Sequence, residues 1–116
     1  MTDEPVDRAS AVNSPVIVAI RSRVPEFDGA FLRALDDEED EMGAFQAMSV
    51  LAEWVEDRIE HSPQSLDALP AFAAVEEIAS SSEYPMGREL VTEFVEALAD
   101  SPRAIALMGP ETVRYR

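Results

Sequence analysis

The chain has 116 residues, of which 24 are acidic and 9 are basic, so its formal net charge at pH 7 is −15. A field of this sign repels the phosphates of nucleic acids and anionic lipids, so we expect a basic protein partner and no direct binding to nucleic acid or membrane. The sequence contains no cysteine, which excludes disulfides, thiolate metal sites and thiol nucleophiles, and its length predicts one domain.

The N-terminal segment is polar and shows no apolar period, which predicts a disordered acidic tail over 1–13 and a single helical domain over 14–116. It carries acids where a secretory signal carries bases, and the apolar run 16–20 is too short to cross a bilayer. We therefore expect a cytoplasmic protein.

The first helix is predicted to begin at Ser14 and Pro15 and to run to about Val24. Serine suits an N-cap, and proline suits the first helical position because its φ is already set. The β-branched residues 16–18 fit a short strand nearly as well. We prefer the helix because the sequence offers no second strand to pair with them.

A second helix is predicted after Pro25, and its apolar face comprises Phe27, Phe31, Leu32 and Leu35. It ends in an unbroken run of six acids, namely Asp36, Asp37, Glu38, Glu39, Asp40 and Glu41. Mutual repulsion disfavours a helix interior here and predicts a solvated loop or a frayed helix end. The run does not match an EF-hand, because loop positions six and twelve would hold Glu41 and Ala47. Its two interpretations are a plain solvated loop and a surface that binds a basic partner.

A third helix is predicted over about 44–60 from apolar residues at helical spacing, namely Phe45, Met48, Leu51, Ala52, Val55 and Ile59. Ala47, Val50 and Trp54 widen this face, which indicates a central helix with two neighbours. The opposite side carries acids, namely Glu53, Glu56, Asp57 and Glu60. Trp54 is interpreted either as a packing residue against the second neighbour or as an anchor for a partner, because tryptophan is frequent in interface hot spots.

Three further helices are predicted in the C-terminal half. The fourth begins within 65–70, ends near Ala79 and buries Phe72, Val75 and Ile78. The fifth covers about 85–99 and separates an apolar half from an acidic stripe of Glu89, Glu93, Glu96 and Asp100. The sixth begins at Ser101 and Pro102 and stops at Gly109 and Pro110, which leaves 111–116 for one further turn.

These patterns predict an all-α fold, a compact bundle of five or six short helices joined by short loops. Short loops favour antiparallel neighbours, so two stacked helical hairpins are one arrangement that fits. In that arrangement the third helix pairs with the fourth, and the fifth pairs with the sixth.

The sequence lacks the residues that catalysis usually requires. His61 is the only imidazole, and it lies at the predicted end of a helix, where a positive charge is favoured. No segment resembles a nucleophile elbow or a glycine-rich phosphate loop. The stripe that includes Glu89 and Glu93 lacks the histidines of a di-iron bundle and lies opposite the apolar face. We therefore expect no enzyme activity, no metal and no cofactor.

Three segments resemble small, acidic, all-helical bacterial proteins of largely uncharacterised function, some of which are taken to be immunity proteins encoded near toxin genes. These segments are 70–78 (PAFAAVEEI), 88–98 (RELVTEFVEAL) and 108–111 (MGPE). The resemblance covers the C-terminal two-thirds of the chain and is mostly amphipathic pattern, with the Gly-Pro pair its most specific part. It implies a helical fold and a protein-binding role, and it assigns no catalytic residue.

Together these observations predict a non-catalytic acidic protein that engages a basic protein partner, with a toxin-neutralising immunity protein as the specific hypothesis. The residues expected to bind the partner are Asp36, Asp37, Glu38, Glu39, Asp40, Glu41 and Trp54. One alternative is a nucleic-acid mimic that inhibits a DNA- or RNA-binding protein, which requires acids in two tracks. A carboxylate-based metal protein is the other alternative, and the oligomeric state stays open.

Overall fold

The computed structural model describes residues 10–37, 42–61 and 68–116. In these residues the chain is all-α, as predicted, with seven helices and no strand beyond an isolated bridge between Ser10 and Gly43. The helices are α1 (Pro15–Arg23), α2 (Pro25–Asp37), α3 (Ala44–His61), α4 (Leu69–Ser80), α5 (Gly87–Ala97), α6 (Pro102–Leu107) and α7 (Pro110–Val113). None of these helices has the length and apolarity needed to cross a bilayer.

The predicted serine and proline signals begin two of the helices. The Ser14 hydroxyl accepts a hydrogen bond from the Ile17 N–H at 3.4 Å, and Pro15 is the first residue of α1. Ser101 likewise accepts from the Ala104 N–H at 3.2 Å at the start of α6. Each hydroxyl satisfies an N–H that the first turn of a helix leaves without an acceptor. The segment 16–18 is therefore helical and not a strand.

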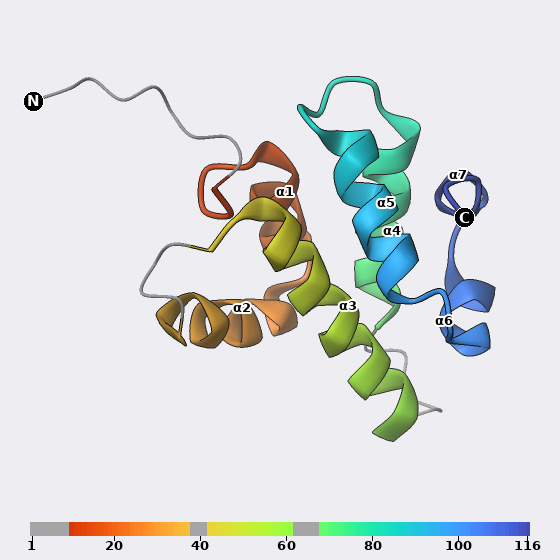
Figure 1. The fold of residues 1–116 in the computed structure, drawn as a ribbon, viewed down its shortest axis with the longest axis horizontal. Coiled ribbons are helices and arrows are strands. Elements are labelled where there is room, and N and C mark those ends of the chain that lie inside the picture. Colours follow the sequence, from red (N-terminus) through yellow and green to blue (C-terminus); the bar gives the residue numbers. More distant parts are fainter. Residues whose placement is uncertain (1–9, 38–41, 62–67) are drawn as a thin grey trace, which may run out of the picture.

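Helix α3 is the central element, and it packs against α1, α2, α5 and α6 (Figure 1). Its wide apolar arc is confirmed, because Met48, Leu51 and Val55 face the interior while Ala47 and Trp54 are buried on the flank. A helix with so wide a buried arc needs neighbours on both sides. Helix α2 covers one side of α3, and α5 covers the other.

Two residues predicted for the core lie at the surface instead. Phe45 in the first turn of α3 is 40% exposed, and Leu32 of α2 is 47% exposed. On α2, the buried positions Phe27, Phe31 and Leu35 recur every fourth residue, and Leu32 lies about 100° away from Phe31 around the helix. The buried face of α2 is therefore narrower than the sequence predicts.

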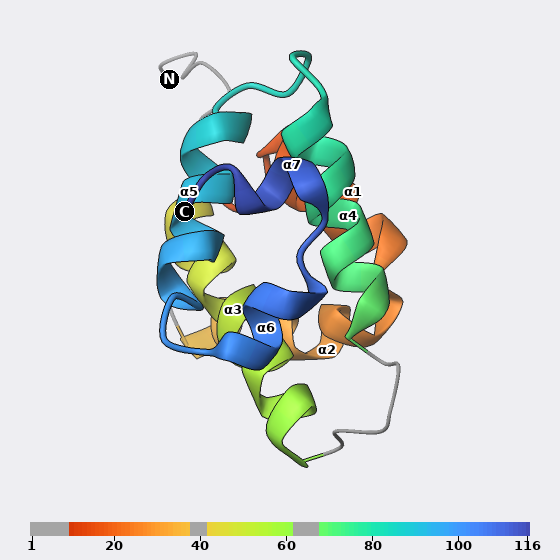
Figure 2. The same ribbon diagram turned by 90° about the vertical axis from the view of Figure 1, so that its right-hand side faces the viewer.

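The helices do not pair as the predicted hairpins. In the described residues, α3 packs on α5 and α2, whereas α4 packs on α1, α5 and α7. Figure 2 shows α7 lying across the space between α4 and α5, with α6 below it. Helices α2 and α5 cover the two flanks of α3, and α4 packs on other helices instead. The hairpin prediction is therefore wrong, although the helix class is right.

The last residues of the expected tail are part of the packed structure. Ala11 is completely buried, and its N–H donates to the Met42 carbonyl at 2.9 Å. The described fold thus begins at Ser10, four residues before the predicted boundary. Residues 1–9, which make up the rest of that expected tail, lie outside the described residues.

Candidate partner-binding surface

Two rows of carboxylates follow α3 and α5. Their members recur three or four residues apart, and this spacing keeps a row on one side of its helix. Each row has three members, and of these six side chains Glu56 and Glu93 are half-buried while the other four are exposed. The row on α3 comprises Glu53, Glu56 and Glu60, and the row on α5 and the turn after it comprises Glu93, Glu96 and Asp100.

Packing of α3 against α5 brings these two rows together. One turn before Glu53, the Ser49 hydroxyl of α3 donates a hydrogen bond to Glu93 Oε2 of α5 at 3.0 Å. Farther along both helices, Glu56, Glu60 and Asp100 line one hollow of about 390 Å³, which Arg103 also borders. The rows therefore lie side by side and run in the same direction. We call the six carboxylates of Glu53, Glu56, Glu60, Glu93, Glu96 and Asp100 the acidic face.

The carboxylates of the acidic face form no ion pair within the described residues, although Arg103 borders the same hollow as three of them. The ion pairs within the described residues join Arg21 to Asp28, Arg23 to Glu77, His61 to Asp57 and Arg114 to Glu111. None of them involves a carboxylate of the acidic face. Such a surface concentrates a negative potential that attracts cationic side chains.

The predicted acid run is only partly within the described residues. Asp36 and Asp37 are exposed and form the end of α2, whereas Glu38, Glu39, Asp40 and Glu41 lie outside the described residues. The sequence prediction for this run therefore stays a prediction.

Trp54 is a core residue. Only 8% of it is exposed, and its ring meets that of Phe27 edge-on with the centroids 5.9 Å apart. The Arg58 guanidinium lies 5.2 Å from the indole centroid. Because the flank of α3 that carries Trp54 is covered by α2, little indole surface is left for a partner. The interpretation as a partner anchor is corrected in favour of packing.

His61 ends α3, as expected, and its side chain is exposed. Its Nδ1 atom lies 3.0 Å from both the Asp57 carbonyl and the Asp57 carboxylate. No group of three or more histidine and carboxylate side chains in the described segments is arranged to hold a metal ion.

One carboxylate that the sequence does not single out holds the C-terminal helix. Glu76 of α4 accepts hydrogen bonds from the Glu111 N–H, the Thr112 N–H and the Thr112 hydroxyl, at 2.9 to 3.1 Å. Gly109 makes this approach possible, because a Cβ at that position would collide with the Glu76 carboxylate. The Gly-Pro pair therefore provides the only local signal of the contact, and nothing in the sequence identifies Glu76 as its partner.

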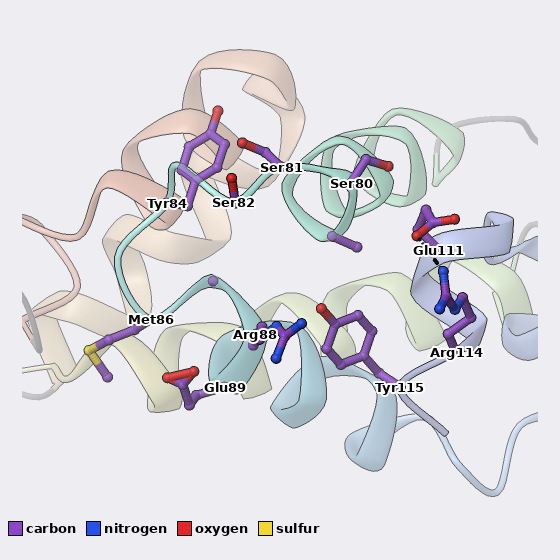
Figure 3. Close-up of a pocket in the computed structure, with 12 residues that line it drawn as sticks. Ser80, Ser81, Ser82, Tyr84, Met86, Arg88, Glu89, Glu111, Arg114 and Tyr115 are labelled. Atoms are coloured by element: carbon purple, nitrogen blue, oxygen red, sulfur yellow. Dashed lines mark hydrogen bonds and ion pairs between the residues drawn. The ribbon is translucent and has the colours of Figure 1, made fainter.

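The same arrangement builds a cleft that sequence reasoning missed. The cleft of about 610 Å³ lies between the segment 79–84, the start of α5 and the C-terminal segment (Figure 3). Its lining includes Arg88, Arg114, Tyr84 and Tyr115. These residues come from distant parts of the chain, so no sequence motif joins them.

Comparison with protein families, curated proteins and solved structures finds no match to this chain. The resemblance to small acidic bacterial proteins therefore stays a prediction.

Proposed function

We propose that this chain is a non-catalytic binding protein whose acidic face engages a basic protein partner. The observation that carries the proposal is the adjacency of the two carboxylate rows, which Ser49 and Glu93 join and which no cation pairs within the described residues. An isolated row is an ordinary solvated helix face. Two adjoining rows on a chain of net charge −15 make one continuous negative surface.

The hollow beside Asp100 offers the most specific contact on this surface. Glu56, Glu60 and Asp100 converge there from α3 and from the turn after α5. Carboxylates in such a position accept the parallel N–H donors of an arginine, and these charge-assisted bonds are stronger than neutral ones. The surrounding carboxylates act mainly on association, because charge complementarity accelerates encounter more than it slows dissociation.

The specific form of the proposal is a toxin-neutralising immunity protein. Its support is the resemblance over 70–78, 88–98 and 108–111, together with an acidity that suits a toxin with a basic site. Cytoplasmic localisation and bacterial origin belong to this proposal. The acid run from Asp36 to Glu41 is proposed as an additional contact for the same partner.

A second candidate function is a nucleic-acid mimic, because the acids do lie in two adjacent rows. Within a row the carboxylates recur about 5 Å apart along the helix axis, since three or four residues rise about 1.5 Å each. Two rows together then carry one charge per roughly 2.5 Å, against about 1.7 Å for duplex DNA. The face resembles a less dense phosphate track, so a mimic would compete with DNA for its partner.

The test compares two variants with the same net charge. Glu53→Gln with Glu96→Gln removes two exposed charges from the acidic face, and Glu26→Gln with Glu83→Gln removes two exposed charges elsewhere. Surface plasmon resonance with an arginine-rich peptide and with candidate basic toxins, over a series of salt concentrations, measures both rate constants. We expect the face variant to slow association severalfold and to reduce its salt dependence, with little change in dissociation.

The control variant should stay close to the wild type, because its charges lie away from the acidic face. Equal losses in the two variants would mean that only net charge matters, and the assignment of the acidic face would be wrong. Adding duplex DNA to the binding assay distinguishes an immunity protein from a nucleic-acid mimic. Displacement of the chain from a nucleic-acid-binding partner indicates mimicry, whereas retention on a toxin without DNA-binding activity indicates immunity.

A further inference from the structure

The cleft at the C-terminal end of α4 has a mixed cationic and aromatic lining. Its volume of about 610 Å³ is within the range of small-molecule sites. Three segments form its walls, namely the turn after α4, the first turn of α5 and the C-terminal segment that Glu76 holds. Figure 3 shows their side chains gathered around one opening.

The cleft combines several hydrogen-bond donors. No carboxylate in the part of the chain that the structure describes lies within ion-pair distance of Arg88. Arg114 gives one N–H to Glu111 at 3.1 Å and keeps its other donors. Ser82 and Tyr84 belong to the same lining, and in Figure 3 the Tyr84 hydroxyl points away from the two arginines. The donors of two guanidinium groups match the several oxygens of a phosphate group.

The acids of the cleft do not cancel this pattern. Glu111 is already paired with Arg114. Glu89 also lines the cleft from the first turn of α5, and in Figure 3 its side chain points away from Tyr115. The lining also includes the first residues of α5, whose N-cap Met86 supplies no side-chain acceptor. A helix start adds a favourable field for an anion that the arginines hold.

An aromatic ring forms the other part of the cleft. The side chains of Arg88 and Tyr115 point toward each other in Figure 3, and Tyr115 is half-buried. A planar group that enters between them would stack on the phenol ring and lie against the guanidinium plane. The lining therefore offers a cationic region and a stacking surface next to each other.

We propose that this cleft binds a small phosphate monoester that carries a planar ring. Arg88 and Arg114 bind the phosphate, and Tyr115 stacks on the ring. The site is independent of the acidic face, which lies on another part of α5 and attracts charge of the opposite sign. Since the net charge of −15 repels anions at a distance, only direct donors can hold one, and screening over about 10 Å at 0.1 M salt weakens that repulsion.

The test titrates the whole chain with adenosine 5′-monophosphate, inorganic phosphate or adenosine, with ¹H–¹⁵N NMR and calorimetry as readouts. We expect the monophosphate to shift the amides of 80–89 and 111–116 in a saturable way, with a dissociation constant below about 1 mM. Adenosine and phosphate should each bind more weakly, because each lacks one half of the ligand.

Two arginine variants with the same net charge provide the control. Arg88→Gln should weaken binding of the monophosphate by about tenfold or more, the usual effect of losing a charged hydrogen bond. Arg103→Gln, an exposed position on α6 that borders a different hollow, should change it by less than about twofold. Tyr115→Leu should weaken the monophosphate and leave phosphate unchanged.

Three results would overturn the proposal. The first is the absence of saturable shifts up to about 10 mM monophosphate. The second is equal weakening by the two arginine variants, which would indicate an effect of net charge alone. The third is adenosine binding as tightly as its monophosphate, because the guanidinium groups would then have no role. Circular dichroism of each variant separates lost binding from lost folding.

Discussion

At the scale of single residues, Glu76 shows how one carboxylate secures the end of a chain. Partial burial raises its pKa, but hydrogen bonds from the Thr112 N–H, the Glu111 N–H and the Thr112 hydroxyl lower it, and the net shift is downward. The bonds outweigh burial because they stabilise the charged form directly. Glu76 thereby supplies acceptors for the N–H groups in the first turn of α7. The N-cap residue of this helix is Gly109, which has no side chain that could accept them.

We predict that Glu76→Gln lowers the free energy of unfolding by about 1–2 kcal/mol at neutral pH, because an amide replaces one acceptor oxygen with a competing donor. Glu77→Gln is the matched control on the same helix. Glu77 pairs with Arg23 at 2.7 Å at the surface, where ion pairs contribute little, so its loss should cost less than about 0.5 kcal/mol. Urea denaturation of both variants measures the difference, and equal costs would contradict the capping role of Glu76.

The same carboxylate predicts a pH dependence. Since its pKa is lower in the folded protein than its ordinary value, its contribution is present above the unfolded pKa and is lost as pH falls through the folded pKa. The difference between the wild type and Glu76→Gln should therefore be full at pH 7 and shrink in acid. Urea midpoints recorded from about pH 7 to about pH 3 test this prediction. A difference that grows in acid would mean that folding raises the pKa of Glu76 and does not lower it.

At the scale of elements, α5 tests how well a helix can be divided into a buried and an exposed side. Phe94 is completely buried, and its ring meets that of Phe72 edge-on at 5.9 Å. We predict that Phe94→Ala costs about 3–5 kcal/mol, because it leaves a cavity beneath α4. Glu96→Ala is the control, since Glu96 is exposed. Thermal and urea unfolding compare them, and similar losses would mean that the division of α5 is wrong.

From the sequence alone, Glu93 would serve equally well as the exposed control for Phe94, but in the structure it is less suitable than Glu96. The helical wheel predicts a solvated side chain, but the structure shows a half-buried carboxylate that accepts a hydrogen bond from Ser49. Periodicity identifies which face of a helix is apolar. It does not identify the helix that will cover a flank, so a contact between residues 49 and 93 lies beyond its reach.

The elements themselves were largely predictable, because helix starts depend on local chemistry. Ser14 with Pro15 and Ser101 with Pro102 begin helices by bonds that span three residues. Helix pairing depends on distant residues instead. The predicted hairpin of α3 with α4 is wrong because the two flanks of α3 pack against other helices. Trp54 on one flank contacts Phe27 of α2, and the other flank packs against α5.

At the scale of the whole molecule, both candidate sites result from packing and not from motifs. The rows around Glu56 and Glu96 were visible in the sequence as separate polar faces, and only the contact of α3 with α5 makes them one surface. The cleft depends on the hydrogen bonds between Glu76 and the segment 111–112, which lies about 35 residues later in the sequence. Spacing rules describe neighbours within a helix, so they could not predict either site.

The charge of −15 also bears on the stability of the folded chain. Unbalanced charge of one sign destabilises a compact state through self-repulsion. Ion pairs within the described segments do little to offset it, because all four involve side chains that are at least a quarter exposed, where each contributes about 0–1 kcal/mol. Raising the ionic strength from about 0.01 M to 0.15 M shortens the screening length from about 30 Å to 8 Å. This shortening weakens the long-range repulsion more than it weakens contacts at ion-pair distance.

We therefore predict that Tm rises with sodium chloride over this range, by several degrees if repulsion falls by about 1 kcal/mol. The variant Glu53→Gln with Glu96→Gln should melt above the wild type at low salt, and its advantage should shrink as salt is added. Sucrose, which does not screen charge, provides the control for general solvent effects. A Tm that falls with added chloride would mean that attraction within ion pairs outweighs the repulsion among the 24 acids.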